Sequence, residues 1–374
     1  MEITYDKFLD KVMNKLDWVS EEVDFVYPYT TTNGRYIKET TYPFGWTNGF
    51  YGGMIWYLYK CTKDEKYLKL AKKCTVFFDK VIDEFNSLSH DVGFQFLLTS
   101  VADAKITGDI RSVTRALHAA TILAGRFNTA GGYIKAWDKN QTFMNPDSFG
   151  EDYVIIDCLM NLPLLFWASE TTKDPRFGQI ANLHLDTVIK HFIREDGSAN
   201  HIVVFNADNG EVIAKPGGQG YKEGSSWSRG QAWAVYGFAM AYHYTKEKKY
   251  LDCAQKAAQY FMSHTKEYVP IDFMQPEIPR YEDTSAAAIC ACGLLEIKKY
   301  VSENESGFYA SSADYLMKIL YKNCDFSHAK QSVLQNCSEM YHREESRHIP
   351  LIYGDFYLLE ALIRFTGKGD ALFY

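Results

Sequence analysis

The sequence predicts an all-α fold in which six helical hairpins close into a ring, a closed (α/α)6 barrel (six-hairpin toroid), with a small β-hairpin in one connection. Three observations support this prediction. Segments with helical periodicity come in pairs, the first helix of each pair is apolar nearly all round, and polar turns of similar sequence join the two helices. A helix that is apolar on all sides must be buried on all sides, so we expect these first helices to line the inside of the ring.

The paired segments recur along the whole chain. Six segments begin with small residues or an aspartate and continue as an apolar helix; they start at Gly49, Gly93, Asp157, Gly230, Ser285 and Gly354. In the first five, the chain then enters a helix with apolar residues at i, i+3 and i+4 spacing, which indicates an outer helix with one buried face. Five of the six carry a related turn: T-K-D, T-G-D, T-K-D, T-K-E and T-G-K-G-D. Such hairpins cannot bury their apolar faces alone, so they must pack on neighbours.

Five complete hairpins and a sixth inner helix leave one outer helix missing. The amphipathic segment of residues 5–18 can supply it, which gives twelve helices in a single domain spanning residues 1–374. An open solenoid is the alternative, but it would need a polar cap where the sequence has an apolar sixth inner helix. Residues 201–213 alternate apolar and polar side chains around Asn209-Gly210, which predicts the β-hairpin.

Composition and charge exclude several classes of function. The net charge of −7 opposes nucleic-acid binding, which usually needs a basic face. The eight cysteines lack metal-type spacing, so we expect core thiols, with no zinc site and no disulfide framework. No segment has the uninterrupted apolar length of a signal peptide or a membrane helix. We therefore predict a cytoplasmic protein without nucleic-acid or membrane partners; its oligomeric state stays open.

In a ring of antiparallel hairpins, the loops that precede the inner helices all lie at one end. These loops are long and rich in glycine and tryptophan, whereas the turns at the other end are short and polar. Long loops on a rigid scaffold are where binding and catalytic residues usually lie. The side chains expected at this rim are Trp46, His90, Asp91, Asp157, Trp227, Ser228, Arg229, Asp283 and Tyr353. Together with the 16% of aromatic residues, they indicate a sugar-binding cleft.

Asp91 and Asp157 are the candidate catalytic groups at this rim. Each could instead cap the helix that follows it, which is a common use of aspartate. Asp157 fits capping less well, because apolar residues precede and follow it and a buried carboxylate is costly without a partner or a function. Taken singly, His90 is typical of an ordinary hydrogen-bonded histidine, Arg229 of a structural ion pair, and the rim tryptophans of packing.

Other chemistries find little support in the sequence. It contains no H-E-x-x-H, no G-x-S-x-G and no G-x-x-x-x-G-K-[ST] motif. The glycine-rich segment 216–220 has the wrong spacing for a dinucleotide-binding loop, and no predicted strand leads into it. We expect a flexible loop beside the cleft.

Four motifs lie at the predicted rim: HDVGF at His90, IIDCLMNLPLLFWA from Ile155, DGSANH ending at His201, and GSSWSRGQAWAVYGF from Gly224. In this combination the chain resembles the unsaturated glucuronyl hydrolases, glycoside hydrolase family 88, from Trp46 to Leu362. The resemblance implies an (α/α)6 barrel with no metal and no organic cofactor. It also implies a substrate made by polysaccharide lyases, a short glycosaminoglycan fragment that ends in a 4,5-unsaturated uronate.

The resemblance also assigns roles to residues. It makes Asp157 the catalytic acid/base and Asp91 its essential partner. The positions that match the sugar pocket, with His90 expected beside them, are Trp46, Trp137, His201, Gln219, Arg229 and Trp233. Arg229 and Gln219 are the candidates to bind the uronate carboxylate and the sugar hydroxyl groups. Arginine suits a carboxylate because its guanidinium can donate two parallel hydrogen bonds to it.

One carboxyl group is enough for the implied chemistry, because the unsaturated uronate is a vinyl ether. Protonation at C4 gives an oxocarbenium-like cation at C5, and the conjugate base then takes a proton from the water that adds to C5. The hemiketal opens and expels the neighbouring sugar. Asp157 must therefore start protonated; a helix N-terminus opposes this, but we expect burial and the charge of Asp91 to prevail.

Three alternatives remain at this stage. Unsaturated rhamnogalacturonyl hydrolases, which act on pectin fragments, have similar HDVGF and WSRGQAW motifs, although IIDCLMNLPLL favours the glucuronyl family. A sugar 2-epimerase on the same barrel would need paired histidines at the rim, for which only His90 and His201 qualify. A non-catalytic glycan-binding protein would not need the buried Asp157.

The segment before the last inner helix bears on sulfate preference. Relatives that favour 6-sulfated chondroitin fragments carry serine and lysine there, whereas this chain has MYHREESRHIPL, with Ser346 and no lysine. Arg343 and Arg347 are the candidates to take the place of the missing lysine. The sequence therefore leaves open the sulfate preference and the choice among chondroitin, hyaluronan and heparin fragments.

Overall fold

The recurring polar turns end one helix and start the next. The Thr62 hydroxyl donates to a carbonyl one turn back at 2.7 Å, and Lys63 ends the helix with a left-handed backbone, φ 61°. Asp64 then accepts from a backbone N–H two residues on at 2.9 Å and caps the next helix. The same three roles recur at residues 172–174, and Gly108 takes the left-handed position in the T-G-D turn. The repeated motif therefore encodes a tight helical hairpin.

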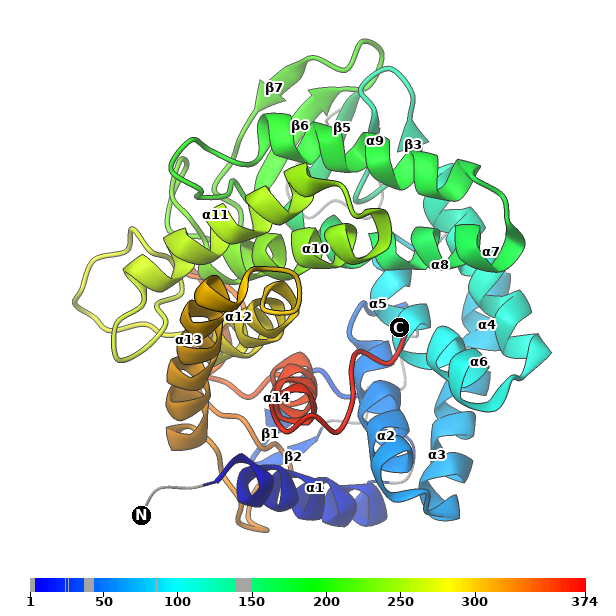
Figure 1. The fold of residues 1–374 in the computed structure, drawn as a ribbon, viewed down its shortest axis with the longest axis vertical. Helices are drawn as coiled ribbons and strands as arrows, with labels where there is room; N and C mark the ends of the chain where they lie inside the picture. The colour runs from blue at the N-terminus through cyan, green and yellow to red at the C-terminus, as the bar shows by residue number, and fades with distance from the viewer. Residues whose placement is uncertain (1–3, 24, 26, 37–43, 85–86, 139–149) are drawn as a thin grey trace.

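The computed structural model describes residues 4–23, 25, 27–36, 44–84, 87–138 and 150–374. The inner helices are α2 (Asn48–Thr62), α5 (Val92–Phe96) continued by a π-helix (Leu97–Val101) and α6 (Ala102–Thr107), α8 (Leu162–Thr172), α10 (Ser228–Thr245), α12 (Thr284–Ile297) and α14 (Ile352–Phe365). The outer helices are α1 (Tyr5–Glu22), α3 (Glu65–Val76) with its extension α4 (Phe78–Asp83), α7 (Ile110–Gly125), α9 (Arg176–His191), α11 (Lys248–His264) and α13 (Glu303–Lys322). Figure 1 shows the outer set on the periphery, around the inner set.

The inner helices form a closed ring. In order around it, α2 packs on α5, α5 on α8, α8 on α10, α10 on α12, α12 on α14 and α14 on α2. Glycines allow the close approach that this ring needs: a Cβ on Gly237 would lie 2.4 Å from the Leu159 Cβ, and one on Gly293 would lie 2.9 Å from the Tyr236 backbone. The predicted closed (α/α)6 barrel is confirmed, and the open solenoid is excluded.

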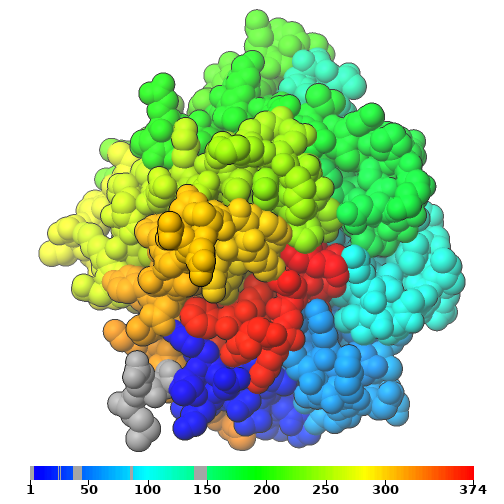
Figure 2. Space-filling model, viewed as in Figure 1, coloured from blue at the N-terminus to red at the C-terminus, as the bar shows by residue number. Residues whose placement is uncertain are grey.

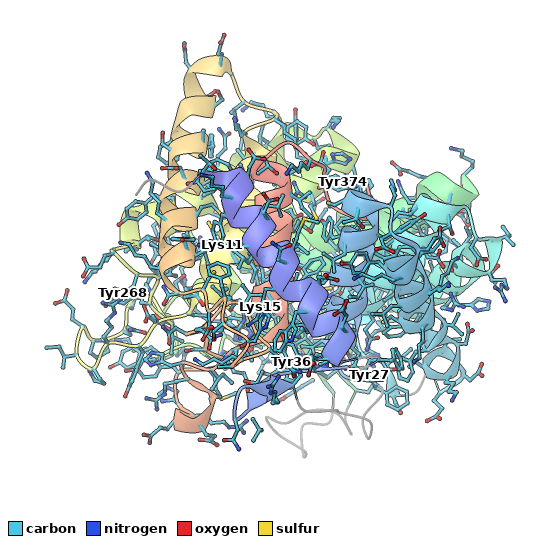
Figure 3. All side chains as sticks on the ribbon, turned by 90° about the horizontal axis from the view of Figure 1, so that it is seen from below. Lys11, Lys15, Tyr27, Tyr36, Tyr268 and Tyr374 are labelled. Carbon is cyan, nitrogen blue, oxygen red and sulfur yellow. The ribbon has the colours of Figure 1, made fainter. Side chains whose placement is uncertain are left out.

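Helix α1 fills the twelfth position, as predicted from residues 5–18. On one side the Tyr5 hydroxyl donates to Asp314 of α13 at 2.5 Å, and on the other Lys66 of α3 lies 2.5 Å from Asp17. The surface in Figure 2 shows the dark blue N-terminal segment between the orange and lighter blue segments. In Figure 3, α1 crosses in front of α14 with Lys11 and Lys15 along its length. The N-terminal helix therefore closes the ring.

The predicted hairpin is part of a larger sheet. Strands β5 (Glu151–Ile155), β6 (Ile202–Asn206) and β7 (Val212–Ala214) form an antiparallel sheet in the order β5-β6-β7. The β6–β7 hairpin is confirmed, whereas β5 was not anticipated, because its partner lies about fifty residues away in the chain. Two further strand pairs are two residues long: β1 (Thr31–Thr32) with β2 (Arg35–Tyr36), and β3 (Phe127–Asn128) with β4 (Tyr133–Ile134).

The third inner helix does not begin at Asp157, as the sequence suggested. Strand β5 ends at Ile155, a short 3-10 helix covers Ile156–Met160, and α8 starts only at Leu162. Asp157 therefore stands between a strand and a helix.

All eight cysteines are free thiols; five are buried, as expected of core thiols, whereas Cys61, Cys253 and Cys324 are partly exposed. Within the described ranges, no helix has both the length and the apolar character needed to cross a membrane. A contiguous apolar cluster extends from α1 to α14, as one domain requires. The single domain over residues 1–374 stays a prediction.

Lys15 should contribute to ring closure more than its neighbour Lys11. Its buried ammonium donates to the backbone carbonyls of Ser327 and Lys330, in the connection that leads to α14, whereas Lys11 is exposed. In Lys15→Met both carbonyls lose their donor, so we expect a loss of about 1–3 kcal/mol in the free energy of unfolding in urea. Lys11→Met is the matched control and should change it by less than about 0.5 kcal/mol. Equal losses in the two variants would contradict the role of Lys15.

Candidate active site

The register of the sheet brings Asp157 next to His201. Ile155 pairs with Ile202 at the end of the β5–β6 ladder. The next N–H, that of Ile156, donates to the His201 carbonyl at 3.0 Å. One residue further, the Asp157 Oδ1 lies 3.8 Å from the His201 Nε2. Two segments far apart in the sequence therefore meet at the mouth of the barrel.

The Asp157 carboxyl is largely removed from water. Its side chain is 14% exposed, and its Oδ1 has no hydrogen-bond partner among the described residues. Burial raises the pKa of Asp157 to about 7; Arg229 acts against this shift, and the charge of Asp91 adds to it. The direction is the one expected from the sequence. A group with such a pKa can both give and take a proton near neutral pH.

Asp91 and His90 form the adjoining part of the rim. The Asp91 carboxylate accepts from the Ser89 hydroxyl at 2.9 Å, and the His90 Nε2 lies 3.3 Å from the Asp91 Oδ1. Although Asp91 precedes α5, its side chain makes no capping hydrogen bond to that helix. The capping alternative therefore does not describe Asp91, and its carboxylate faces the rim.

Asn161, which the sequence did not single out, joins the two catalytic segments. Its side-chain oxygen accepts from the Phe94 backbone N–H at 2.9 Å, so it satisfies the start of α5 in place of Asp91. A Cβ on Gly93 would lie 2.4 Å from Asn161, which requires glycine at this contact. The close packing places Asp91 near the 3-10 helix that carries Asp157. A side chain that acts through such a long-range contact leaves no local signal in the sequence.

Arg126 is a second residue that the sequence did not reveal. Its guanidinium donates to the Leu88 carbonyl at 3.3 Å, to the Ala136 carbonyl at 3.2 Å and to Asp138 at 2.9 Å. The His90 backbone N–H donates to the same Ala136 carbonyl at 3.1 Å. Arg126 therefore fixes the loop before α5 against the segment that carries Trp137.

His201 is a neutral ring with a defined proton position. Burial lowers the pKa of His201 to about 3, and the charge of Arg229 acts in the same direction. Its Nδ1 accepts from the Gln219 backbone N–H at 3.0 Å, and its ring lies 4.3 Å from that of Trp227. Because Nδ1 is the acceptor, the proton of the neutral ring is on Nε2, the nitrogen that faces Asp157.

The loop of residues 216–220 is anchored, which argues against the expected flexibility. The Gln219 side chain donates to the Glu339 carbonyl at 2.9 Å, and the Gln219 carbonyl accepts from the Tyr341 N–H at 2.9 Å. Gly218 has a left-handed backbone, φ 60°, and a Cβ there would lie 2.1 Å from the His201 Nδ1. The glycine therefore allows the loop backbone to reach the histidine.

Arg229, in the first turn of α10, is 1% exposed and has partners within the protein. It donates to Asp283 at 2.7 Å and to the backbone carbonyls of Ser338 and, at 2.7 Å, Glu339. Its guanidinium also lies 4.4 Å from the ring of Trp227. The ion pair that the sequence left as an alternative is therefore present. Its positive charge still acts on Asp157.

The predicted tryptophans take two kinds of position. Trp46 and Trp137 are partly exposed at the rim, with Trp46 4.8 Å from Tyr353 and Trp137 6.4 Å from Tyr153. Trp233 is fully buried among aromatic rings. Partly exposed indole faces can stack on a sugar ring, whereas Trp233 offers only its N–H.

Several buried polar atoms without a hydrogen-bond partner lie at this rim. Such atoms are rare in native proteins, because each one costs about 1–3 kcal/mol. Within the described part of the chain, those at the rim are the Asp157 Oδ1, the His201 Nε2, both His90 ring nitrogens, the indole nitrogens of Trp227 and Trp233, and the Tyr353 hydroxyl. The rim therefore holds seven of the seventeen such atoms in the described chain, and a bound polar ligand could provide partners for them.

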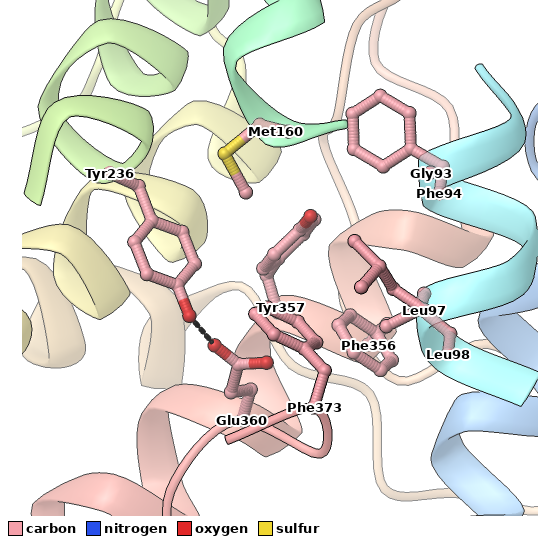
Figure 4. Close-up of a pocket in the computed structure, with 10 residues that line it drawn as sticks. All are labelled: Gly93, Phe94, Leu97, Leu98, Met160, Tyr236, Phe356, Tyr357, Glu360 and Phe373. Carbon is pink, nitrogen blue, oxygen red and sulfur yellow. Dashed lines mark hydrogen bonds between the residues drawn. The ribbon is translucent and has the colours of Figure 1, made fainter. Parts of the chain in front are cut away.

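The floor of the site is apolar. Figure 4 shows a cavity inside the barrel, lined by residues of α5, α10 and α14 and by Met160 of the 3-10 helix that also contains Asp157. At its far end Tyr236 donates a hydrogen bond to Glu360. The other residues that line it are Gly93, Phe94, Leu97, Leu98, Met160, Phe356, Tyr357 and Phe373. These side chains close the barrel below the carboxylates.

Comparison with known proteins identifies the family. The model of Glycosyl Hydrolase Family 88 matches residues 20–269. The chain belongs to this family. It is therefore a glycosidase.

Relatives of this family 88 chain are similar over most of its length. An unsaturated glucuronyl hydrolase of Bacillus sp. (strain GL1) is 35% identical over 85% of this chain and 85% of its own. An unsaturated chondroitin disaccharide hydrolase of Streptococcus agalactiae serotype III is 31% identical over 98% of this chain and 91% of its own. The crystal structure of the Bacillus sp. GL1 unsaturated glucuronyl hydrolase, responsible for the degradation of glycosaminoglycan, superposes with a TM-score of 0.91 at 31% identity, covering 99% of both chains.

The segment that precedes α14 in this family 88 chain places its polar residues unequally. Ser346 is 3% exposed and donates to the Arg343 carbonyl at 3.0 Å, so its hydroxyl is turned inward. The Arg343 side chain is 52% exposed, and the Arg347 guanidinium lies 4.1 Å from the Tyr281 ring. Of the residues named from the sequence, Arg343 is therefore the one at the surface, whereas Arg347 is half-buried against Tyr281.

No group of three or more His, Cys, Asp or Glu side chains in the described part of the chain is arranged to hold a metal ion. The chemical groups that the rim offers are the Asp157 carboxyl, the Asp91 carboxylate and the neutral His201. The arrangement is suited to proton transfer to and from one bound sugar.

The raised pKa of Asp157 should appear in the pH dependence of stability. Between about pH 4 and pH 7 the folded protein binds a proton at Asp157 that the unfolded chain has released, so rising pH weakens folding in this window. Asp157→Asn removes this contribution. We expect the variant to gain stability relative to the wild type from pH 4 to pH 7, with a constant difference above that. Urea unfolding at a series of pH values measures it, and a flat difference across the window would contradict the raised pKa.

Proposed function

We propose that the chain is an unsaturated glucuronyl hydrolase that releases 4,5-unsaturated uronate from the non-reducing end of lyase-generated glycosaminoglycan oligosaccharides. The observation that carries this proposal is the buried Asp157, with a pKa of about 7, beside the neutral His201 and the Asp91 carboxylate. The named activities of the similar proteins from Bacillus and Streptococcus support it. A rhamnogalacturonyl substrate is not favoured by these relatives.

The proposed reaction uses Asp157 twice. In its protonated form it gives a proton to C4 of the unsaturated ring, which leaves positive charge on C5 and the ring oxygen. The Asp157 carboxylate then removes a proton from the water that adds to C5. The hemiketal formed at C5 opens and releases the neighbouring sugar with its own oxygen. The carboxyl returns to its protonated form, so protons and oxygen atoms balance.

The surrounding residues support these steps in different ways. The Nε2–H of His201 can stabilise the Asp157 anion in the second step. Asp91, through its charge, favours the protonated form from which the first step starts. Gln219 uses its N–H groups on the protein, which leaves its side-chain oxygen to accept from a sugar hydroxyl. Arg229 supplies positive potential for the uronate carboxylate from its ion pair with Asp283.

A sugar 2-epimerase on the same barrel has less support. Such an enzyme would use His90 and His201 as a pair of titrating bases. Both rings are buried, which lowers the pKa of each histidine, and the His201 Nδ1 is occupied by a backbone N–H.

We also propose a cytoplasmic location, because the free cysteines suit a reducing compartment.

Substitution of Asp157 tests the proposed role directly. Asp157→Asn keeps the shape of the side chain and removes the proton donor, so turnover of an unsaturated chondroitin disaccharide should fall by about 10²–10⁴-fold. Loss of absorbance of the conjugated alkene follows the reaction. Asp252→Asn, at an exposed ion pair with Lys248, is the control and should keep wild-type turnover. Near-normal activity of folded Asp157→Asn would remove Asp157 from the acid/base role, and turnover of pectin fragments alone would replace the proposed substrate.

Labelled water distinguishes hydration from ordinary glycosidic cleavage. If water adds at C5, reaction in water enriched in ¹⁸O should place the label on the keto acid at the former C5, while C1 of that acid keeps the former ring oxygen and the released sugar keeps the bridging oxygen. Mass spectrometry of both products immediately after cleavage measures this. Label at C1 together with a surviving alkene would overturn the hydration mechanism.

A further inference from the structure

A second histidine is buried behind the rim, outside the set that matches the sugar pocket. His184 lies on the outer helix α9 and is 0% exposed, as is His90. Both residues are tied to one short stretch of backbone: the His184 Nδ1 accepts from the Ile134 N–H of β4 at 3.0 Å, and the backbone N–H of His90 donates to the Ala136 carbonyl at 3.1 Å. They are close enough that a charge on His90 would oppose one on His184.

The proton of His184 has a fixed position. Burial lowers the pKa of His184 to about 3, so the ring is neutral at working pH. Its Nδ1 is the acceptor for the Ile134 N–H, which puts the single ring proton on Nε2. That Nε2–H is buried and has no acceptor among the described residues. An orphaned donor of this kind is costly.

His90 has the complementary requirement. Its Nε2 lies 3.3 Å from the Asp91 Oδ1, and a bare nitrogen lone pair at that distance from a carboxylate would be repulsive. Burial lowers the pKa of His90, so this ring is also neutral and its proton belongs on Nε2. The Nδ1 is then a bare acceptor, buried and without a donor in the described part of the chain.

An orphaned donor and an orphaned acceptor therefore lie behind the same rim segment. We propose that His184 is a positioning residue for the hydrolysis: its Nε2–H donates to the His90 Nδ1 through one enclosed water, and so holds His90 in the tautomer whose Nε2–H faces Asp91. The order of donation runs from the Ile134 N–H through His184 and His90 to the Asp91 carboxylate. This inference rests on the proposed function for its effect on turnover.

The tautomer of His90 matters because of what surrounds Asp91. An N–H directed at the carboxylate stabilises its negative charge, which in turn keeps Asp157 protonated. Besides Asp91, the charge that acts on His90 is Arg126, and Arg229 acts on Asp157 in the neighbouring 3-10 helix. In the opposite tautomer, the His90 Nε2 would present a lone pair to Asp91 and weaken that arrangement.

Two conservative variants separate positioning from simple packing. The amide of asparagine reaches the place of the histidine Nδ1, so His184→Asn keeps the acceptor for Ile134 but removes the donor toward His90. The amide of glutamine reaches the place of Nε2, so His184→Gln keeps that donor. We expect kcat on the unsaturated disaccharide to fall about tenfold in His184→Asn, the size of one lost hydrogen bond, with KM changed less than about twofold. His184→Gln should recover most of the loss.

Nitrogen-15 NMR of histidine-labelled full-length protein provides a readout that does not depend on activity. In the wild type the His90 signals, assigned by their loss in His90→Gln, should show a protonated Nε2 and a bare Nδ1. In His184→Asn they should shift toward the other tautomer. His191→Gln, a half-buried histidine on the same helix, is the matched control and should change neither kcat nor the His90 signals.

Each outcome decides the proposal. Full activity in both His184 variants, or a greater loss in His184→Gln than in His184→Asn, would contradict the proposal. His184 would then only bind β4 through the Ile134 N–H. If both variants lose activity equally, an unchanged His90 tautomer overturns the proposal, whereas a shifted one supports it. A wild-type His90 protonated on Nδ1 overturns it outright. If the wild type fails to act on the disaccharide, the proposed function fails, while the tautomer measurement still tests the pathway to Asp91.

Discussion

The site depends on keeping the Asp157 carboxyl away from water. A solvated aspartate is an anion at neutral pH and has no proton to give. The two charges that act on Asp157, Arg229 and Asp91, shift its pKa in opposite directions, so desolvation decides the direction of the shift. The barrel produces that desolvation. The β5–β6 ladder ends beside Asp157, and apolar side chains such as Phe94 and Met160 fill the interior of the barrel next to it.

Three connections at the mouth of the barrel are held together through one backbone carbonyl. The Glu339 carbonyl accepts from both Arg229 and Gln219, so α10, the loop of residues 216–220 and the segment before α14 share a single contact point. Asp283 completes the arrangement with an ion pair to Arg229 at 2.7 Å. Because these charges are buried, removal of either partner would leave the other without compensation. The rim is therefore rigid at its charged centre.

The buried charged groups at the two ends of the barrel differ in how they are paired. At the end away from the rim, Arg364 lies 2.6 Å from Glu296 and 3.2 Å from Glu360, and Tyr236 and Tyr57 donate to Glu360. These charges compensate one another within the protein. The Arg364 Nε and the Tyr374 hydroxyl at that end also lack hydrogen-bond partners, but the charged groups are paired; at the rim the Asp157 Oδ1 and the His201 Nε2 make no hydrogen bond in the described chain. The first arrangement stabilises the fold, whereas the second is suited to binding a polar ligand.

The sequence by itself determined the helical architecture and which residues lie at the rim. Periodicity shows which face of a helix is buried, and the T-x-D turns fix the hairpins through local hydrogen bonds, so six inner helices and their loops could be located without coordinates. Motif resemblance then named Asp91 and Asp157. Both steps use information that lies within a few neighbouring residues.

Only the tertiary structure decided the chemistry of those residues. Strand β5 forms because a distant segment, β6, offers it a ladder, and this pairing moves Asp157 out of the predicted helix start and next to His201. The contacts of Asn161, Arg126 and His184 likewise join segments that are remote in the chain. The pKa of Asp157 depends on how much water and charge the folded chain leaves around it. Desolvation and long-range hydrogen bonds are properties of packing, and local sequence patterns do not record them.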